Sequence, residues 1–173
     1  MVETAAVAIP VSAEAIVREI EALGITHVIN VPDTHQKTVL ALLARQTHPT
    51  LITACTEDEA VGINAGLYAG GKRPMLLIQN TGLLASLNCV KGIAMDASVP
   101  TFMLVGLFGR DVTKTPDDDP RRVINRIGPT LDTWEIPWYP LEHPDQIGAI
   151  AEAYQRSLET RGPTVVLVGA PTS

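Results

Sequence analysis

Residues 50–80, TLITACTEDEAVGINAGLYAGGKRPMLLIQN, decide the fold class. Two apolar runs, 50–55 and 75–80, flank a segment over about 57–69 that is rich in Ala and Gly. Short apolar runs bounded by polar residues predict buried strands, and the longer segment between them predicts a helix. A strand, a helix and a second strand in this order predict a βαβ unit, in which the two strands are parallel.

The same alternation extends over the rest of the chain. Further strands are expected at 26–31, 101–106, 136–142 and 164–169, and further helices at 12–23, 35–46, 130–134 and about 147–158, with a loop leading into a helix over 81–96. The polar, turn-rich segment 107–122 predicts a long loop or lid. The fold class is therefore α/β, a single open, mainly parallel sheet of about six strands with helices on both faces. Residues 12–173 are expected to form this domain, after an N-terminal arm over 1–11.

Composition excludes several classes of protein. The 173 residues are 46% hydrophobic, which is enough for the core of one domain. A net charge of −6 without a run of Lys or Arg argues against nucleic acid or a membrane surface as the main partner. The N-terminus resembles neither a signal peptide nor a membrane anchor, and the two cysteines, Cys55 and Cys89, are expected to be buried free thiols. We therefore expect a cytoplasmic protein.

Polar residues follow three of the expected strands. They are VPDTHQK at 31–37, CTEDE at 55–59 and QNTG at 79–82. In an open parallel sheet, ligands bind outside the carboxyl ends of the strands, so these segments predict the functional site. The sequence has no G-x-G-x-x-G after a strand and no P-loop, and its four histidines lack zinc spacing, so no metal ligand is assigned to this chain.

The acidic triplet at 57–59 is open to two interpretations. Carboxylates at the start of a helix interact favourably with the helix dipole and are usually solvated, which is the common structural role. The glycines and alanines that follow, however, let another backbone or subunit approach closely. In that case a carboxylate at the start of the helix would be covered by a partner.

Three motifs together resemble one family. EDEAVGINAGLYAGGKRPMLLIQNTGLLASLN at 57–88, VPDTHQK upstream and GRDVTKTPDDDPRRV downstream resemble the pyrimidine-binding domain of thiamine diphosphate enzymes. Within these enzymes, the chain is most similar to the α subunit or N-terminal half of sulfopyruvate and phosphonopyruvate decarboxylases. The resemblance covers roughly residues 12–170. It implies a subunit of a thiamine-diphosphate-dependent 2-oxo acid decarboxylase, a carboxy-lyase.

The resemblance also implies the site residues. Glu57 stands nine residues before Gly66, where the family places its catalytic glutamate, which hydrogen-bonds the aminopyrimidine and favours its imino tautomer. The implied cofactor-binding residues are Glu57, Gln79, Asn80, Thr81, Gly82 and Leu83. The implied substrate-binding residues are Asp33, Thr34, His35, Lys37 and Arg110. Without the resemblance, Lys37 would be an ordinary solvated lysine and 79–82 a polar turn, and Asp58 and Glu59 remain structural or interfacial.

Half of a thiamine diphosphate site is missing from the sequence. The family binds the diphosphate and Mg²⁺ through a G-D-G segment, and this chain contains no Gly-Asp pair. The resemblance therefore implies a β subunit that carries this domain and the metal, in a hetero-oligomer such as α2β2 or larger. Asp111 and the acidic run 117–119 depart from the family pattern and leave the 2-oxo acid substrate undefined. A carboligase subunit, a non-catalytic assembly subunit and an unrelated small-ligand binder remain alternatives.

Overall fold

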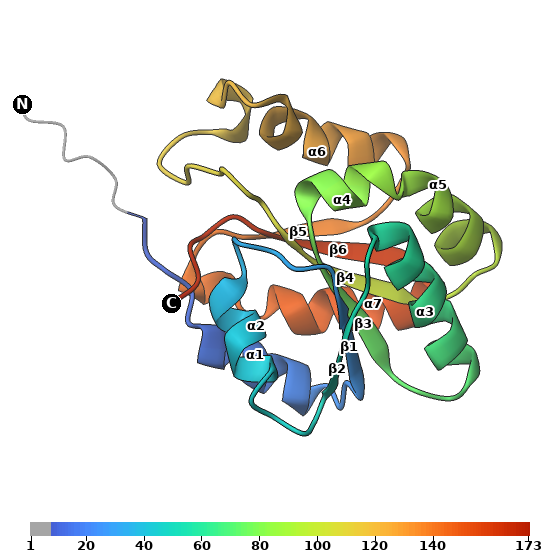
Figure 1. Ribbon diagram of the computed structural model, residues 1–173. Helices are drawn as coiled ribbons and strands as arrows, with labels where there is room; N and C mark the ends of the chain where they lie inside the picture. The colour runs from blue at the N-terminus through green and yellow to red at the C-terminus, as the bar shows by residue number, and fades with distance from the viewer. Residues whose placement is uncertain (1–7) are drawn as a thin grey trace, which may run out of the picture.

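One six-stranded sheet forms the centre of the computed structural model, which describes residues 8–173 (Figure 1). The strand order is β2-β1-β3-β4-β6-β5, and every neighbouring pair is parallel. The strands are β1 (His27–Asn30), β2 (Thr50–Thr53), β3 (Pro74–Gln79), β4 (Thr101–Gly106), β5 (Trp138–Leu141) and β6 (Pro163–Val168). This architecture confirms the expected fold class.

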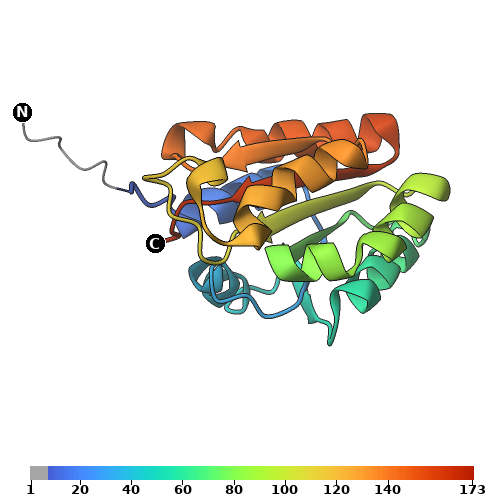
Figure 2. The same cartoon turned by 90° about the horizontal axis from the view of Figure 1, so that it is seen from above.

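Helices cover both faces of the sheet (Figure 2). On one face, α1 (Ala13–Ala22), α2 (Lys37–Leu43) and α7 (Ala149–Thr160) pack into a continuous apolar cluster. The other face is covered by α3 (Glu57–Ala69), α4 (Asn80–Ala85), α5 (Leu87–Cys89), a π-helix over Val90–Asp96, and α6 (Arg122–Thr133). Short 3₁₀ turns lie at Pro116–Asp118 and Pro144–Gln146. Among residues 8–173 no helix is both long and apolar enough to cross a bilayer.

Local sequence explains where the helices next to the expected site begin. The side chain of Thr56 accepts a hydrogen bond from the Glu59 amide at 3.3 Å, so α3 starts at Glu57, as expected. Its buried residues Ala60, Val61 and Asn64 recur at helical spacing. The strand β3 is buried up to Ile78, and α4 begins at Asn80 without an intervening loop. A loop was expected at the start of the segment 81–96, but the helix α4 has already begun there, with Gln79 as its N-cap residue.

The largest error in the expected elements concerns α6. Pro129 was expected to open a short helix over 130–134, but it lies inside a helix that begins at Arg122. Ile124, Ile127 and Leu131 recur at helical spacing and are buried against the sheet. Burial of an aliphatic side chain contributes about 1.5–3 kcal/mol, so three of them outweigh the ~3 kcal/mol cost of an interior proline.

The expected arm lies partly outside the described residues, since the description starts at residue 8. Val11, its last residue, is buried and forms a parallel bridge with Thr172, so the two ends of the domain lie side by side. The cysteines are free, as expected, but the expectation that both are buried is wrong: Cys55 is exposed and Cys89 is partly buried. Cys55 is exposed because it lies in the turn between β2 and α3.

Candidate functional site at the carboxyl edge of the sheet

The predicted site residues lie where the chain changes direction across the sheet. From β1 the chain moves outward to the edge strand β2, and then returns to place β3 on the other side of β1. The loops after β1 and β3 therefore diverge at one point, the topological switch point at which open α/β sheets bind ligands. The segment 31–37 follows β1 and the segment 79–82 follows β3, so the fold brings two of the three predicted segments to this point.

Asp33 is the centre of a buried polar network. Its Oδ1 accepts hydrogen bonds from the His35 amide at 2.8 Å and from Gln79 Nε2 at 3.3 Å. Its Oδ2 accepts one from Gln36 Nε2 at 3.1 Å. Gly106, at the end of β4, leaves the space for this carboxylate, because a Cβ there would overlap Asp33 Oδ2. Asp33 thus connects the ends of β1, β3 and β4.

Gln36 is a member of this network that the sequence did not single out. Its side chain is fully buried, and Nε2 also approaches the carbonyl oxygens of Ile78 at 3.3 Å and Leu104 at 3.4 Å. These contacts fix the orientation of the amide, which in turn orients Asp33. The position of Gln36 between Asp33 and Lys37 is the only sequence signal that could have identified it.

Glu57 is the first residue of α3, and its half-buried side chain lies against α4. A Cβ built on Gly82 would lie 2.5 Å from Glu57 Cγ and would overlap Cδ and Oε1, so only glycine leaves room for this carboxylate. Among the residues that the structure describes, no donor is hydrogen-bonded to it. A partly accessible carboxyl group without an internal partner fits the requirement for a group that bonds the aminopyrimidine of thiamine diphosphate.

The other two acids of the triplet lie outside this contact. Both Asp58 and Glu59 are exposed, and Glu59 Oε2 accepts a hydrogen bond from the Cys55 amide at 2.7 Å, which stabilises the start of α3. Asp58 lies beside the Cys89 thiol. The pKa of this thiol is raised mainly by burial, and further by a hydrogen bond and the charge of Asp58. The structure thus separates Glu57 from its two neighbours.

The start of α4 extends the polar surface. Thr81 Oγ1 donates to Gln79 Oε1 at 2.7 Å, and Gln79 in turn donates to Asp33. Asn80 is fully buried; its Oδ1 accepts from the Thr81 amide at 2.8 Å. Leu83 is fully buried in the apolar cluster, so it packs α4 against the sheet and presents no surface to the site. These contacts link the predicted cofactor residues to the Asp33 network.

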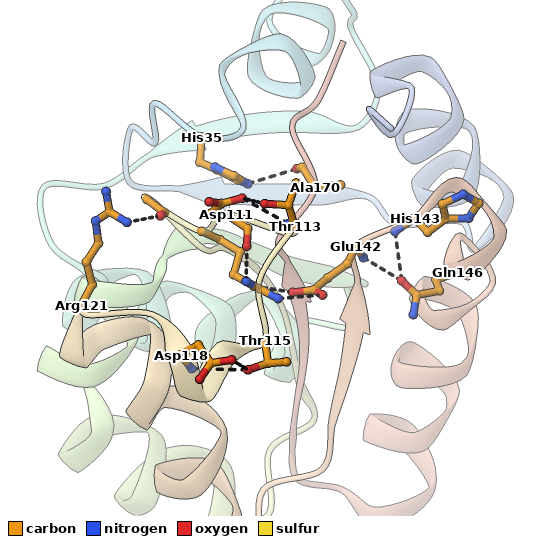
Figure 3. A network of polar contacts seen from close by, with 12 residues as sticks. His35, Asp111, Thr113, Thr115, Asp118, Arg121, Glu142, His143, Gln146 and Ala170 are labelled. Carbon is orange, nitrogen blue, oxygen red and sulfur yellow. Dashed lines mark hydrogen bonds and ion pairs between the residues drawn. The ribbon is translucent and has the colours of Figure 1, made fainter. Parts of the chain in front are cut away.

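Thr34, His35 and Lys37 surround Asp33 on the β1 side. The side chains of Thr34 and Lys37 are exposed and line a shallow hollow beside Asp33. His35 Nε2 lies 3.1 Å from the Ala170 carbonyl oxygen (Figure 3). Burial lowers the pKa of His35, and the nearby Asp33 carboxylate opposes this shift. The imidazole therefore links the β1 loop to the C-terminal segment.

Arg110 is not brought to the Asp33 network. Its side chain is 1% exposed and forms a bidentate ion pair with Glu142, with Nε–Oε1 at 2.6 Å and Nη2–Oε2 at 3.1 Å. Nη1 donates to the Asp111 carbonyl oxygen. Gln146 holds the backbone of Glu142 in turn, because its Oε1 accepts a hydrogen bond from the Glu142 amide at 2.7 Å (Figure 3). Two guanidinium nitrogens, Nε and Nη2, thus anchor the 107–121 loop to the end of β5, and the third, Nη1, is bonded within the loop.

The polar residues at the carboxyl edge do not form a metal site by themselves. Within residues 8–173, no three His, Cys, Asp or Glu side chains are grouped so that they could hold a metal ion. The arrangement instead offers one free carboxylate, one buried hydrogen-bonded carboxylate and several amides at the switch point. Such a fold and site are typical of α/β domains that bind a small organic ligand at the sheet edge.

Comparison with known families identifies the domain. Residues 11–124 match the family described as thiamine pyrophosphate enzyme, N-terminal TPP binding domain, and the chain belongs to this family. The match confirms the resemblance to the pyrimidine-binding domain of thiamine diphosphate enzymes that the motifs indicated. The match includes every predicted site residue.

Two similar relatives are named sulfopyruvate decarboxylase subunit alpha. The protein from Methanococcus maripaludis is 28% identical over 160 residues, which cover 92% of this chain and 95% of the relative. The protein from Methanocaldococcus jannaschii is 30% identical over 133 residues, 76% of this chain and 77% of the relative. A phosphonopyruvate decarboxylase from Streptomyces viridochromogenes is 26% identical, covering 74% of this chain and 32% of the relative.

A solved structure agrees with the fold. Benzoylformate decarboxylase from Polynucleobacter necessarius superposes with a TM-score of 0.73 at 20% identity, covering 92% of this chain and 30% of that one. At this identity the likeness concerns the fold alone. The chain corresponds to somewhat less than a third of that protein.

Proposed function

We propose that this chain is the α subunit of a heteromeric thiamine-diphosphate-dependent 2-oxo acid decarboxylase. Two relatives named subunit alpha align with most of the chain and over most of their own length, at 28% and 30% identity. The observation that carries the proposal is the half-buried Glu57 carboxylate, which has no hydrogen-bond donor among residues 8–173 and lies against Gly82 at the carboxyl edge of the sheet. Retention of this pair is what a catalytic subunit requires, whereas a purely assembling subunit does not need it.

Glu57 is the proposed catalytic residue. When bound, thiamine diphosphate supplies the ring that accepts the electron pair released by decarboxylation. Glu57 holds a proton in a hydrogen bond to the N1′ atom of the aminopyrimidine, which favours the tautomer that acts as the base. Gly82, without a side chain, leaves room for the carboxylate. Gln79 and Thr81 border the aminopyrimidine at the start of α4, and the buried Asn80 supports them through its hydrogen bond with the Thr81 amide.

The β1 side is the proposed substrate side. Lys37 and Thr34 are exposed beside the Asp33 carboxylate, and Lys37 supplies a cation for an anionic group of a 2-oxo acid. His35 and Asp33 orient this loop through their hydrogen bonds. Arg110 positions the 107–121 loop through Glu142, and we do not place it on the substrate.

A partner subunit completes the proposed site. We propose that a β subunit supplies the residues that bind the diphosphate and Mg²⁺, because Mg²⁺ is usually held by phosphate oxygens and one or two carboxylates. The chain has no G-D-G segment that could do so. The two kinds of subunit would form a hetero-oligomer, such as α2β2, in which the partner covers the Glu57 carboxylate.

Reconstitution tests the proposal. The chain would be produced alone and with its co-purifying partner, and calorimetry would measure thiamine diphosphate binding in the presence of Mg²⁺. Carbon dioxide release from sulfopyruvate, phosphonopyruvate and pyruvate would measure activity. We expect binding and decarboxylation only in the complex. Decarboxylation by the isolated chain would overturn the two-subunit arrangement, and a complex that binds the cofactor but only joins two substrates would be a carboligase.

A further inference from the structure

A further cavity extends from the carboxyl ends of β4 and β5 along α6. It has a volume of about 290 Å³ and is enclosed by α6, the ends of β5 and β6, and the 107–121 loop. It shares no lining residue with the Asp33 network or with the Glu57–Gly82 contact. In Figure 1, α6 lies over this part of the sheet. The volume lies at the lower end of cavities that bind small molecules, about 300–1,000 Å³.

Rigid apolar groups form most of the wall: Leu107, Ile124, Ile127, Trp138, Pro140 and Leu167. The Trp138 ring is held in place because its Nε1 donates to Asp132 Oδ1 at 2.8 Å. Gly128 lets the ring lie against α6, since a Cβ at that position would be 3.2 Å from Trp138 Cζ2. On the side of α6, β5 and β6, the shape of the cavity is therefore set by regular secondary structure and a fixed indole ring.

The polar groups of the wall that lack a hydrogen-bond partner are acceptors. Asn125 Oδ1 is buried and has no donor among residues 8–173, while Asn125 Nδ2 donates to the Asp119 carbonyl oxygen at 2.9 Å. Pro129 has no N–H, so the backbone carbonyl of Asn125 also lacks its usual helical donor. A buried acceptor without a donor costs about 1–3 kcal/mol, so a ligand that donates to it would be favoured.

The charges around the cavity disfavour an anion. The guanidinium of Arg110 is already occupied by both oxygens of Glu142 and by the Asp111 carbonyl. Asp117, an exposed carboxylate, also lines the cavity. The cation of the wall, Arg110, is therefore already paired, so a 2-oxo acid would compete with Glu142 for it and would be repelled by the Asp117 carboxylate.

We propose that this cavity binds a small apolar amine. The apolar body would lie against Trp138 and the aliphatic side chains, and its ammonium or N–H group would donate to Asn125 Oδ1. This inference does not rest on the proposed decarboxylase activity, because the cavity and the catalytic residues are separate. It assigns to the domain a second ligand of the opposite charge to a 2-oxo acid.

The indole resonances of the two tryptophans provide a direct test. Trp138 is part of the cavity wall, whereas Trp134 is 37% exposed and does not line the cavity. The full-length chain, with any partner that co-purifies, would be labelled with ¹⁵N-tryptophan and titrated with phenethylamine. Trp134→Phe would assign the two peaks. We expect phenethylamine to shift the Trp138 peak and leave the Trp134 peak unchanged.

Two comparisons test the donor–acceptor part of the inference. The acid of matching shape, 3-phenylpropionate, should bind at least about tenfold more weakly than phenethylamine. Asn125→Leu removes the acceptor at nearly constant size and should weaken the amine about tenfold, whereas Asn88→Leu, at an exposed position outside the cavity, should not. An unshifted Trp138 peak, or equal binding of the amine and the acid to the wild type, would overturn the proposal even if Asn125→Leu failed to fold.

Discussion

Replacement of Gly82 by alanine tests how Glu57 is positioned. Gly82 lies in the first turn of α4, and its φ is outside the positive range, so alanine can adopt the same backbone conformation. The added Cβ would lie 2.5 Å from Glu57 Cγ, whereas carbon atoms pack at about 3.5–4.0 Å. Glu57 must therefore move by about 1 Å or more. A displacement of this size at a reacting group costs about 100-fold in rate.

Stability should change much less than activity. Glu57 is half-buried and no described group is hydrogen-bonded to its carboxylate, so its side chain can turn toward solvent. Alanine gains up to about 1 kcal/mol over glycine in a helix, and overpacking costs about 1–3 kcal/mol. We therefore expect the free energy of unfolding of Gly82→Ala to fall by no more than about 2 kcal/mol.

The assay compares turnover and urea unfolding in the reconstituted complex. Gly148→Ala is the matched control, because Gly148 lies outside the site at the start of α7, has a right-handed helical backbone conformation, and a Cβ there meets nothing within 4 Å. This control should keep full turnover and gain up to about 1 kcal/mol of stability. Wild-type turnover in Gly82→Ala would refute the idea that this contact fixes the carboxylate.

Three further predictions concern the supporting residues. In Gly106→Ala the new Cβ meets the buried side chains of Asp33 and Gln36, which cannot turn aside. The free energy of unfolding in urea should therefore fall by about 1–3 kcal/mol, and an unchanged midpoint would contradict this. Burial lowers the pKa of His35, so the unfolded state binds protons more readily, and stability should fall as the pH drops below about 6.5. His35→Gln should reduce this pH dependence, measured by urea unfolding between about pH 5 and 7.5, a range that includes the ordinary histidine pKa. Equal slopes in the two proteins would exclude this role of His35. Glu142→Gln leaves the Arg110 charge unpaired at 1% exposure and should lower the free energy of unfolding, measured with heat or urea, by about 3–5 kcal/mol. Arg110→Met leaves a carboxylate that is 28% exposed, so its loss should be smaller, and the reverse order would disprove this.

Local sequence was sufficient for most of the architecture. The two apolar runs in 50–80 and the Ala- and Gly-rich segment between them predicted a strand, a helix over about 57–69 and a second strand, and all three are present. The expected start of α6 was wrong because Pro129 does not begin the helix. The spacing of Ile124, Ile127 and Leu131 was already visible and indicates a helix that continues through Pro129.

The contacts within the site depend on the tertiary fold. Gln36 reaches the carbonyl oxygens of Ile78 and Leu104, and Arg110 pairs with Glu142 across 32 positions. Which strand ends become neighbours depends on the strand order, and the spacing of residues does not encode it. The sequence therefore indicated that the polar segments lie at the carboxyl edge of the sheet, whereas the Glu57–Gly82 contact and the pairing of Arg110 required the structure.

Turnover of a Glu57→Gln complex tests the proposed function most directly. Glutamine keeps the size of the side chain but cannot share a proton with the aminopyrimidine in the same way. Asp58→Asn is the matched control, because Asp58 is the adjacent residue and is exposed. We expect both variants to assemble with the partner, Asp58→Asn to retain activity, and Glu57→Gln to release no carbon dioxide from the 2-oxo acid. Full decarboxylase activity in Glu57→Gln would contradict the assignment of Glu57 as the catalytic residue.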